Sequence, residues 1–237
     1  MQHTIYFFSE GYRLRGVLHL PETENPPVVI GSHGLFSTGD SPKQTALAEQ
    51  CLKRGMAFFR FDHRGCGRSD GDFAIATTFE GRCRDLVRAV EVMQARPEIG
   101  KHIGLFGSSF GGAVCLSVAA QFEVKAIVTV AAPLSSGSIR PPDVNDPANS
   151  PLIENLDKAA LFFDLGDSIQ NLSRLLIFHG DRDAVVPFSN ALELYAKASE
   201  PKRLIRQAGG AHSMSDPGHQ KEFTDLAAWW FEKHLLF

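Results

Sequence analysis

The feature that most constrains the fold is a regular alternation of strand-like and helix-like segments along almost the whole 237-residue chain. Continuous apolar runs, such as residues 26–34 and 56–62, are typical of strands that are buried on both faces of a sheet. Amphipathic or apolar helical patterns follow these runs. Alternation of this kind predicts an α/β fold in which helices cover both faces of a mostly parallel sheet.

Eight strands are expected in this sheet, and the first two form an antiparallel hairpin. They are residues 3–8, 12–20, 26–34, 56–62, 101–107, 124–133, 173–181 and 202–210. Helices are expected at residues 41–55, 77–96, 110–122, 188–199 and 219–237. In the first of these helices, Ser41 suits the N-cap, Pro42 the first helical position and Gly55 the stop.

The alternation is interrupted at residues 134–173. Prolines 133, 141, 142, 147 and 151 exclude long regular structure from the first half, whereas residues 152–172 have the pattern of one or two helices. Connections of this length usually have a function. We therefore expect a small lid insertion within a single domain that spans residues 1–237, and an inert surface excursion is the alternative.

Charge and composition exclude some classes of partner and indicate a compartment. A formal net charge of −3 provides no basic field, so we expect no nucleic-acid partner. The first 20 residues lack a signal-peptide pattern, and no apolar run is long enough to span a membrane, so we expect no membrane association. Four scattered cysteines indicate free thiols in a reducing compartment, and the cytoplasm is the expected location. The sequence does not indicate an oligomeric state.

A short glycine-rich segment carries the first candidate for catalysis. Residues 104–112 read Gly-Leu-Phe-Gly-Ser-Ser-Phe-Gly-Gly, and the Gly-x-Ser-x-Gly pattern centred on Ser109 lies between a predicted strand and a predicted helix. This is the context of a nucleophile elbow, in which a tight turn exposes one hydroxyl above the sheet edge. The following helix N-terminus favours developing negative charge there. We expect Ser109 to be a nucleophile and only small residues to fit at 107, 111 and 112.

A serine hydroxyl needs a base, and the base needs an orienting carboxylate. His212 follows the last predicted strand and is expected at the same sheet edge as Ser109, whereas His219 on the terminal helix is a poorer choice. Asp181 and Asp183 both follow the seventh strand, and the pattern alone leaves both open. The chain order Ser, Asp, His is that of α/β hydrolases.

Five segments together resemble one superfamily. They are residues 32–35, 62–71, 107–112, 179–187 and 209–214. Through them the chain resembles α/β-hydrolase serine hydrolases over nearly its whole length, and most resembles small bacterial cinnamoyl or feruloyl esterases with short lids.

This resemblance implies roles for several residues. It assigns the acid to Asp183, four residues before a proline, rather than to Asp181. It implies an oxyanion hole formed by the backbone N–H groups of Leu35 and Phe110, and it implies no metal or organic cofactor. Four further residues are expected to lack a role in the chemistry: His33, Asp62 and Arg64 as structural residues, and Cys66 as an inert thiol.

The expected activity is hydrolysis of a small-molecule carboxylic ester through an acyl-enzyme intermediate. A thioesterase or another acyl hydrolase of the same fold is the alternative, and a ligand-binding protein without catalysis is the non-enzyme alternative. Phe36, Phe162 and Phe163 are expected to bind the substrate and to favour an apolar or aromatic acyl group. Packing of Phe162 and Phe163 within the lid is equally consistent with the sequence.

Overall fold

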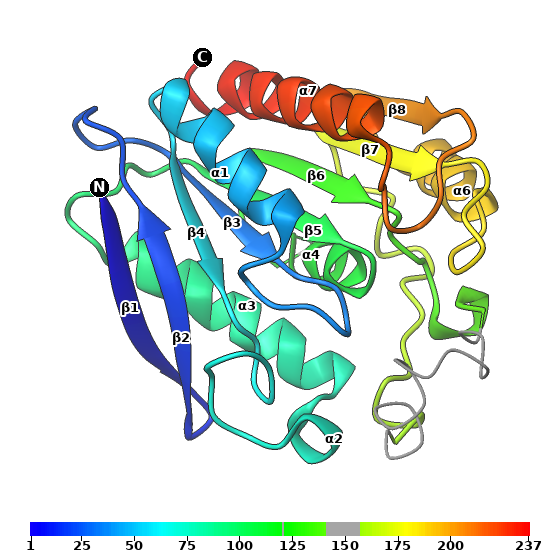
Figure 1. The fold of residues 1–237 in the computed structure, drawn as a ribbon, viewed down its shortest axis with the longest axis horizontal. Helices are drawn as coiled ribbons and strands as arrows, with labels where there is room; N and C mark the ends of the chain where they lie inside the picture. The colour runs from blue at the N-terminus through cyan, green and yellow to red at the C-terminus, as the bar shows by residue number, and fades with distance from the viewer. Residues whose placement is uncertain (120, 141–156) are drawn as a thin grey trace.

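Eight strands form one sheet in the computed structural model, which describes residues 1–119, 121–140 and 157–237 (Figure 1). The strands are β1 (Gln2–Ser9), β2 (Tyr12–His19), β3 (Val28–Ser32), β4 (Ala57–Phe61), β5 (Ile103–Ser108), β6 (Ala126–Val130), β7 (Leu175–Gly180) and β8 (Lys202–Gln207). Their order across the sheet is β1-β2-β4-β3-β5-β6-β7-β8. β2 pairs antiparallel with both β1 and β4, and the other neighbours are parallel. The predicted mostly parallel sheet is confirmed.

Helices lie on both faces of this sheet, as predicted. They are α1 (Pro42–Lys53), α2 (Phe73–Ala76), α3 (Phe79–Gln94), α4 (Phe110–Ala119), α6 (Ser189–Lys197) and α7 (Pro217–Leu235), with a short 3₁₀ turn, η1 (Ser136–Ser138). The buried side chains of α1 and α7 belong to one apolar core, and those of α3, α4 and α6 belong to the other. The sheet is therefore the middle layer of three (Figure 1).

The two cores follow from the alternation of side chains along each strand. In β3, Val28 and Ile30 pack into the core with α3 and α4, and Val29 packs into the core with α1 and α7. The side chains of β7 also alternate between the two cores. A strand with both faces covered in this manner is apolar at most successive positions, with a few buried polar residues such as Ser32 and His179, which explains the continuous runs in the sequence.

The prediction of helix over residues 152–172 is wrong for its described part, which consists of turns between residues 158 and 172. Asp164 instead forms an antiparallel bridge with Ser135, and Gly166 has a φ of 49° that a helix does not accept. The apolar side chains of this segment, among them Leu165 and Ile169, are buried against the main core. Packing onto the body of the protein overrides the local helical pattern.

Residues 141–156 of the expected lid lie outside the described residues, so the lid and the single-domain boundaries stay predictions. One helix was not expected from the sequence. In α2, the carboxylate of Asp72 accepts hydrogen bonds from the N–H groups of Ala74 and Ile75 and caps this single turn.

The turn that joins β5 to α4 is unusually tight. A Cβ atom added to Gly107 would lie 2.4 Å from the carbonyl oxygen of Gly111 and 2.6 Å from the Cα of Gly112. One added to Gly111 would lie 2.2 Å from the carbonyl oxygen of Ser32. These contacts are with backbone atoms, which cannot rotate away. The prediction that only small residues fit here is confirmed.

We expect Gly107→Ala to lower the free energy of unfolding by about 1–3 kcal/mol or more, since the turn must open to admit the methyl group. Urea denaturation of the purified variant measures this change. Gly137→Ala is the matched control because its added methyl group would meet nothing closer than 3.9 Å, and its stability should stay within about 0.5 kcal/mol of wild type. Equal stability of the two variants would contradict this account of the turn.

Candidate active site

The candidate residues follow strands whose carboxyl ends share one edge of the sheet. Ser109 lies in the β5–α4 turn, Asp183 in the loop after β7 and His212 in the loop after β8. These three strands run parallel, and their arrowheads point to the same side of the molecule (Figure 1). Parallel strands thus bring together Ser109 and His212, which are 103 positions apart in the chain.

Ser109 has a strained backbone. Its φ is 53°, in the left-handed region that residues other than glycine rarely adopt. Its N–H donates to the carbonyl oxygen of Val130 at the end of β6, 2.8 Å away, and its own carbonyl oxygen accepts from Gly112 N–H at 2.7 Å. These hydrogen bonds stabilise a backbone conformation that is unfavourable by itself, as is common at functional sites.

The three side chains form one hydrogen-bonded row. His212 Nδ1 lies 2.8 Å from Asp183 Oδ2, and His212 Nε2 lies 2.9 Å from Ser109 Oγ. Because a carboxylate only accepts, Nδ1 carries the proton and donates it to Asp183. Nε2 is then the bare nitrogen, and it accepts a hydrogen bond from the Ser109 hydroxyl. This tautomer leaves a base pointed at the hydroxyl.

Asp183 is buried, and its carboxylate is surrounded by donors. Oδ1 accepts hydrogen bonds from the N–H groups of Val185 and Val186, at 2.9 and 2.8 Å. The ring of His179 lies on its other side, with Nε2 3.3 Å from Oδ2. Burial alone would raise the pKa of Asp183, but His179, His212 and the Val186 N–H outweigh it and hold the pKa below its ordinary value. The carboxylate is therefore ionised at neutral pH.

Asp181, the other carboxylate that the sequence offered, faces elsewhere. It accepts hydrogen bonds from Gly209 N–H at 2.7 Å and from Arg206 Nε at 2.9 Å. It therefore ties the loop after β7 to β8, and only Asp183 contacts His212.

The two backbone groups expected in the oxyanion hole lie beside Ser109. Phe110 is its neighbour in the chain, and a Cβ added to Gly34, which precedes Leu35, would lie 3.6 Å from the Ser109 Cβ. Among the described residues, the N–H groups of Leu35 and Phe110 have no backbone carbonyl as acceptor. Their assignment to an oxyanion hole stays a prediction.

Comparison with known protein families identifies the chain. Residues 23–155, more than half of its length, match the family model described as "Serine aminopeptidase, S33". The chain belongs to this serine aminopeptidase family. It is accordingly a hydrolase with the α/β-hydrolase fold, and the predicted resemblance is confirmed.

Individual relatives of this family member are distant. The uncharacterized protein YfhR of Escherichia coli O157:H7 is 28% identical over 213 residues, which cover 86% of this chain and 70% of YfhR. The mitochondrial palmitoyl-protein thioesterase ABHD10 of Mus musculus is 34% identical over 104 residues, which cover 44% of this chain and 33% of ABHD10.

Solved structures share the fold. Est1E of Butyrivibrio proteoclasticus, determined with bound ferulic acid, superposes with a TM-score of 0.85 at 21% identity, covering 98% of this chain and 100% of that one. The esterase domain of a Rhodothermus marinus protein superposes with a TM-score of 0.75 at 24% identity, covering 99% of each chain.

The aromatic residues expected to bind substrate lie in different surroundings. Phe36 is 47% exposed, with its ring 5.8 Å from that of Phe73. Phe162 is 70% exposed, whereas Phe163 is only 4% exposed. The Phe163 ring packs edge-on against that of Phe110 at 5.6 Å. Phe36 and Phe162 are thus largely exposed, whereas Phe163 is buried beside Phe110, and substrate contact by these residues stays a prediction.

One contact beside His212 was not expected from the sequence. Lys43, on α1, reaches across to donate from Nζ to the carbonyl oxygen of Ser213, 2.9 Å away. It thereby ties α1 to the residue that follows His212. A lysine on an amphipathic helix carries no sequence signal for this contact.

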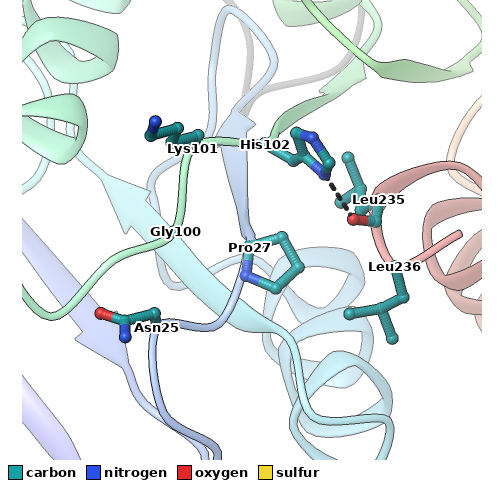
Figure 2. A pocket seen from close by; sticks show the side chains of 7 residues that line it. All are labelled: Asn25, Pro27, Gly100, Lys101, His102, Leu235 and Leu236. Carbon is teal, nitrogen blue, oxygen red and sulfur yellow. Dashed lines mark hydrogen bonds between the residues drawn. The ribbon is translucent and has the colours of Figure 1, made fainter.

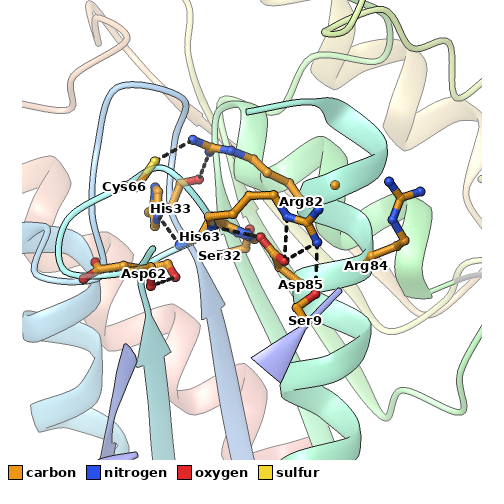
Figure 3. Close-up of polar contacts among 12 residues, drawn as sticks. Ser9, Ser32, His33, Asp62, His63, Cys66, Arg82, Arg84 and Asp85 are labelled. Atoms are coloured by element: carbon orange, nitrogen blue, oxygen red, sulfur yellow. Dashed lines mark hydrogen bonds and ion pairs between the residues drawn. The ribbon is translucent and has the colours of Figure 1, made fainter. Parts of the chain in front are cut away.

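A second Ser–His–Asp group, formed by Ser32, His63 and Asp85, lies inside the protein (Figure 3). Ser32 Oγ lies 2.9 Å from His63 Nε2, and His63 Nδ1 lies 3.4 Å from Asp85 Oδ2, outside good hydrogen-bond geometry. All three side chains are fully buried, so a substrate ester has no access to them. Composition alone does not make a catalytic group, because access and alignment are also required.

The residues expected to be structural belong to this buried region. His33 Nδ1 donates to Gly34 at 2.8 Å, and His33 Nε2 accepts from His63 N–H. Asp62 accepts from the N–H groups of two loop residues. Arg64 bonds to Asp85 through two side-chain nitrogens. Burial raises the pKa of the Cys66 thiol and so favours its unreactive form.

An open pocket, whose lining residues are shown in Figure 2, lies at the end of the sheet opposite to Ser109. It is lined by the segments that precede β3 and β5 and by the end of α7, where His102 Nδ1 donates to the carbonyl oxygen of Leu235 at 2.7 Å. Because it faces the amino ends of the strands, it has no access to Ser109.

Two features are absent from the described residues. Within them, no helix is both long and apolar enough to cross a membrane. The same residues contain no group of three His, Cys, Asp or Glu side chains arranged to hold a metal ion. The expectation that no metal takes part stays a prediction.

We expect acid to destabilise the protein through its buried histidines. Burial lowers the pKa of His63 to about 4, so this ring stays neutral in the folded state while the unfolded chain takes up a proton below about pH 6.5. The contribution of the neutral His63 ring to the free energy of unfolding is complete above about pH 6.5 and is lost as the pH falls toward 4. Between pH 7 and pH 5, His63 alone should cost about 2 kcal/mol.

Urea denaturation at a series of pH values measures this loss. His63→Gln, which cannot titrate, should be less stable than wild type at pH 7 but should lose about 2 kcal/mol less between pH 7 and pH 5. Parallel pH profiles for wild type and variant would contradict the assignment.

Proposed function

We propose that this protein is a serine esterase that hydrolyses a small-molecule carboxylic ester through an acyl-enzyme intermediate. The observation that carries the proposal is the row of two hydrogen bonds, 2.9 Å from Ser109 Oγ to His212 Nε2 and 2.8 Å from His212 Nδ1 to Asp183 Oδ2. The tight, strained turn that holds the half-buried Ser109 supports it further.

In the first half-reaction, Ser109 Oγ attacks the ester carbonyl carbon while His212 Nε2 removes the hydroxyl proton. Asp183 stabilises the imidazolium that forms and keeps the ring oriented. The carbonyl oxygen becomes an oxyanion and accepts hydrogen bonds from the N–H groups of Leu35 and Phe110. Loss of one such donor typically costs about 3–4 kcal/mol. The C–O bond then breaks, and the leaving alcohol takes the proton from His212.

In the second half-reaction, water replaces the alcohol. His212 removes one proton from the water as its oxygen attacks the acyl carbon, and a second oxyanion forms in the same place. The bond to Ser109 Oγ then breaks, the serine regains its proton from His212, and the carboxylic acid leaves. The cycle needs no cofactor, and the protonated form of His212 cannot begin it.

The nature of the leaving group separates two candidate activities. Likeness to esterase structures favours an oxygen ester, whereas the partial match to ABHD10, a thioesterase, favours a thioester as the second candidate. We propose Phe36 and Phe162 as the residues that contact an apolar or aromatic acyl group, since both rings are open to ligand. The proposed compartment is the cytoplasm, because scattered cysteines are typical of a reducing environment.

Labelling with a fluorophosphonate probe tests the nucleophile. Wild type should form a covalent adduct, and Ser109→Ala should form none because the attacking oxygen is absent. Ser32→Ala is the matched control, since it removes the serine of the buried group, and it should label at a rate close to that of wild type. Intact-protein mass spectrometry reads the adduct. An unlabelled wild type would support the ligand-binding alternative.

A substrate panel distinguishes the two activities. We expect kcat/KM to be higher for p-nitrophenyl esters and aryl esters than for acyl thioesters of matched chain length. Phe36→Ala should lower kcat/KM for hydrophobic acyl groups roughly 10-fold, in line with the loss of one apolar contact, and should leave acetate esters nearly unaffected. A preference for thioesters would replace the esterase with the second candidate.

A further inference from the structure

A completely buried arginine lies against the loop that carries Leu35. Arg82, on α3, has an exposed fraction of 0% and is among the largest fully buried side chains of the described residues. Within those residues, no carboxylate oxygen lies within 4.0 Å of its nitrogens. Burying a cation without a paired anion is costly. Such a side chain needs another set of partners, and their identity indicates its role.

The partners of Arg82 are carbonyl oxygens of a single loop. Nη1 donates to Gly34 at 3.2 Å and to His33 at 3.4 Å, and Nη2 donates to Leu35 at 2.9 Å. Nη2 also lies 3.2 Å from Cys66 Sγ (Figure 3). Three consecutive carbonyl groups therefore converge on one guanidinium, and they compensate its charge with their dipoles.

The position of these carbonyl groups determines the direction of the Leu35 N–H. The Gly34 carbonyl and the Leu35 N–H belong to the same peptide group, and a trans peptide directs them in opposite directions. Since Arg82 and His33 Nδ1 both hold the Gly34 carbonyl, the Leu35 N–H is turned away from the guanidinium. This N–H is one of the two donors assigned to the oxyanion.

Arg82 also contacts the residue that provides the other donor. Its guanidinium carbon lies 5.5 Å from the centroid of the Phe110 ring, within the range of a cation–π contact. Phe79 and Phe163 pack against the same ring from other directions. One buried side chain thus touches both Leu35 and Phe110, although they lie on separate elements.

We propose that Arg82 is a positioning residue that aims the oxyanion hole. It acts through Leu35 and Phe110 rather than by touching the substrate. Its positive charge, on the far side of the Gly34–Leu35 peptide, further polarises the N–H toward the developing oxyanion. The proposal rests on the esterase function proposed above, in which Ser109 generates that oxyanion.

Three substitutions separate the charge of Arg82 from its geometry. Arg82→Lys keeps a charge but cannot hold three carbonyl groups in one plane. Arg82→Gln keeps donors but removes the charge, and Arg82→Met removes both. Arg64→Gln is the matched control, because Arg64 is also a buried arginine but bonds to Ser9, Glu10 and Asp85 instead of the 33–35 loop.

Steady-state hydrolysis of a p-nitrophenyl ester, normalised to active sites titrated with a fluorophosphonate, is the primary readout. We expect kcat per titrated site to fall roughly 10- to 100-fold in Arg82→Gln and Arg82→Met, less than the 10²–10³ typical of deleting a donor. KM should change less than about 3-fold, since ground-state binding is untouched. Arg82→Lys should fall between these variants and wild type.

Affinity for an aryl trifluoromethyl ketone is the second readout, because its adduct with serine places an oxyanion in the hole. This affinity should fall by the same factor as kcat/KM across the Arg82 series. Arg64→Gln should lose stability but keep kcat per titrated site within about 3-fold of wild type. A purely structural Arg82 would instead reduce the number of titrated sites and leave kcat per site unchanged.

The outcomes distinguish this proposal from the function on which it rests. If wild type neither labels nor hydrolyses any ester or thioester, the proposed function fails and the role of Arg82 fails with it. If wild type is active but the Arg82 variants keep wild-type kcat per site, only the positioning role is overturned. Arg82→Lys, the mildest change, can be assayed at low temperature if the other variants fold poorly.

Discussion

The close contact between backbone segments at the β5–α4 turn is the constraint on which the site depends. Gly107, Gly111 and Gly112 allow the strand, the helix and the end of β3 to approach within distances that a single methyl group would prevent. The approach places Ser109 in a left-handed conformation, anchored to the end of β6. Without it, the hydroxyl would not stand above the sheet edge where the other candidate residues meet.

Around this turn, the supporting contacts come from every neighbouring element. β7 and β8 deliver Asp183 and His212, and Lys43 of α1 holds the residue after His212. Arg82 of α3 gathers the carbonyl groups of the loop after β3. Each contact orients a group relative to Ser109, so the precision of the site is a property of the whole α/β sandwich rather than of one loop.

The buried Ser32–His63–Asp85 group shows why residue types alone are insufficient. It contains the same three residue types as the candidate triad, but it lies inside the protein and its second contact is poorly aligned. Its location suggests a different use: it links β3, the loop after β4 and α3 beneath the 33–35 loop. Exposure and alignment, rather than composition, distinguish the two groups.

Much of the fold could be predicted because local patterns and the tertiary environment agree. Runs such as residues 26–34 are apolar at successive positions since both faces of their strands are covered, and eight strands with helices on both faces follow from that alternation. The pattern failed at residues 158–172, where burial against the main core competes with a helical sequence. The single turn of α2 was too short to produce a periodic signal.

By itself, the sequence determined the chain order of serine, aspartate and histidine, the small residues around Ser109 and the three-layer α/β architecture, because these depend on local sterics and hydrophobic periodicity. The resemblance to α/β hydrolases already assigned the acid to Asp183 rather than Asp181, and the contact of Asp183 with His212 agrees with that assignment. Only the tertiary structure decided that Phe163 is buried beside Phe110 and that Arg82 lies against the 33–35 loop. These two contacts depend on side-chain directions between segments that are distant in the chain, and no local pattern encodes them.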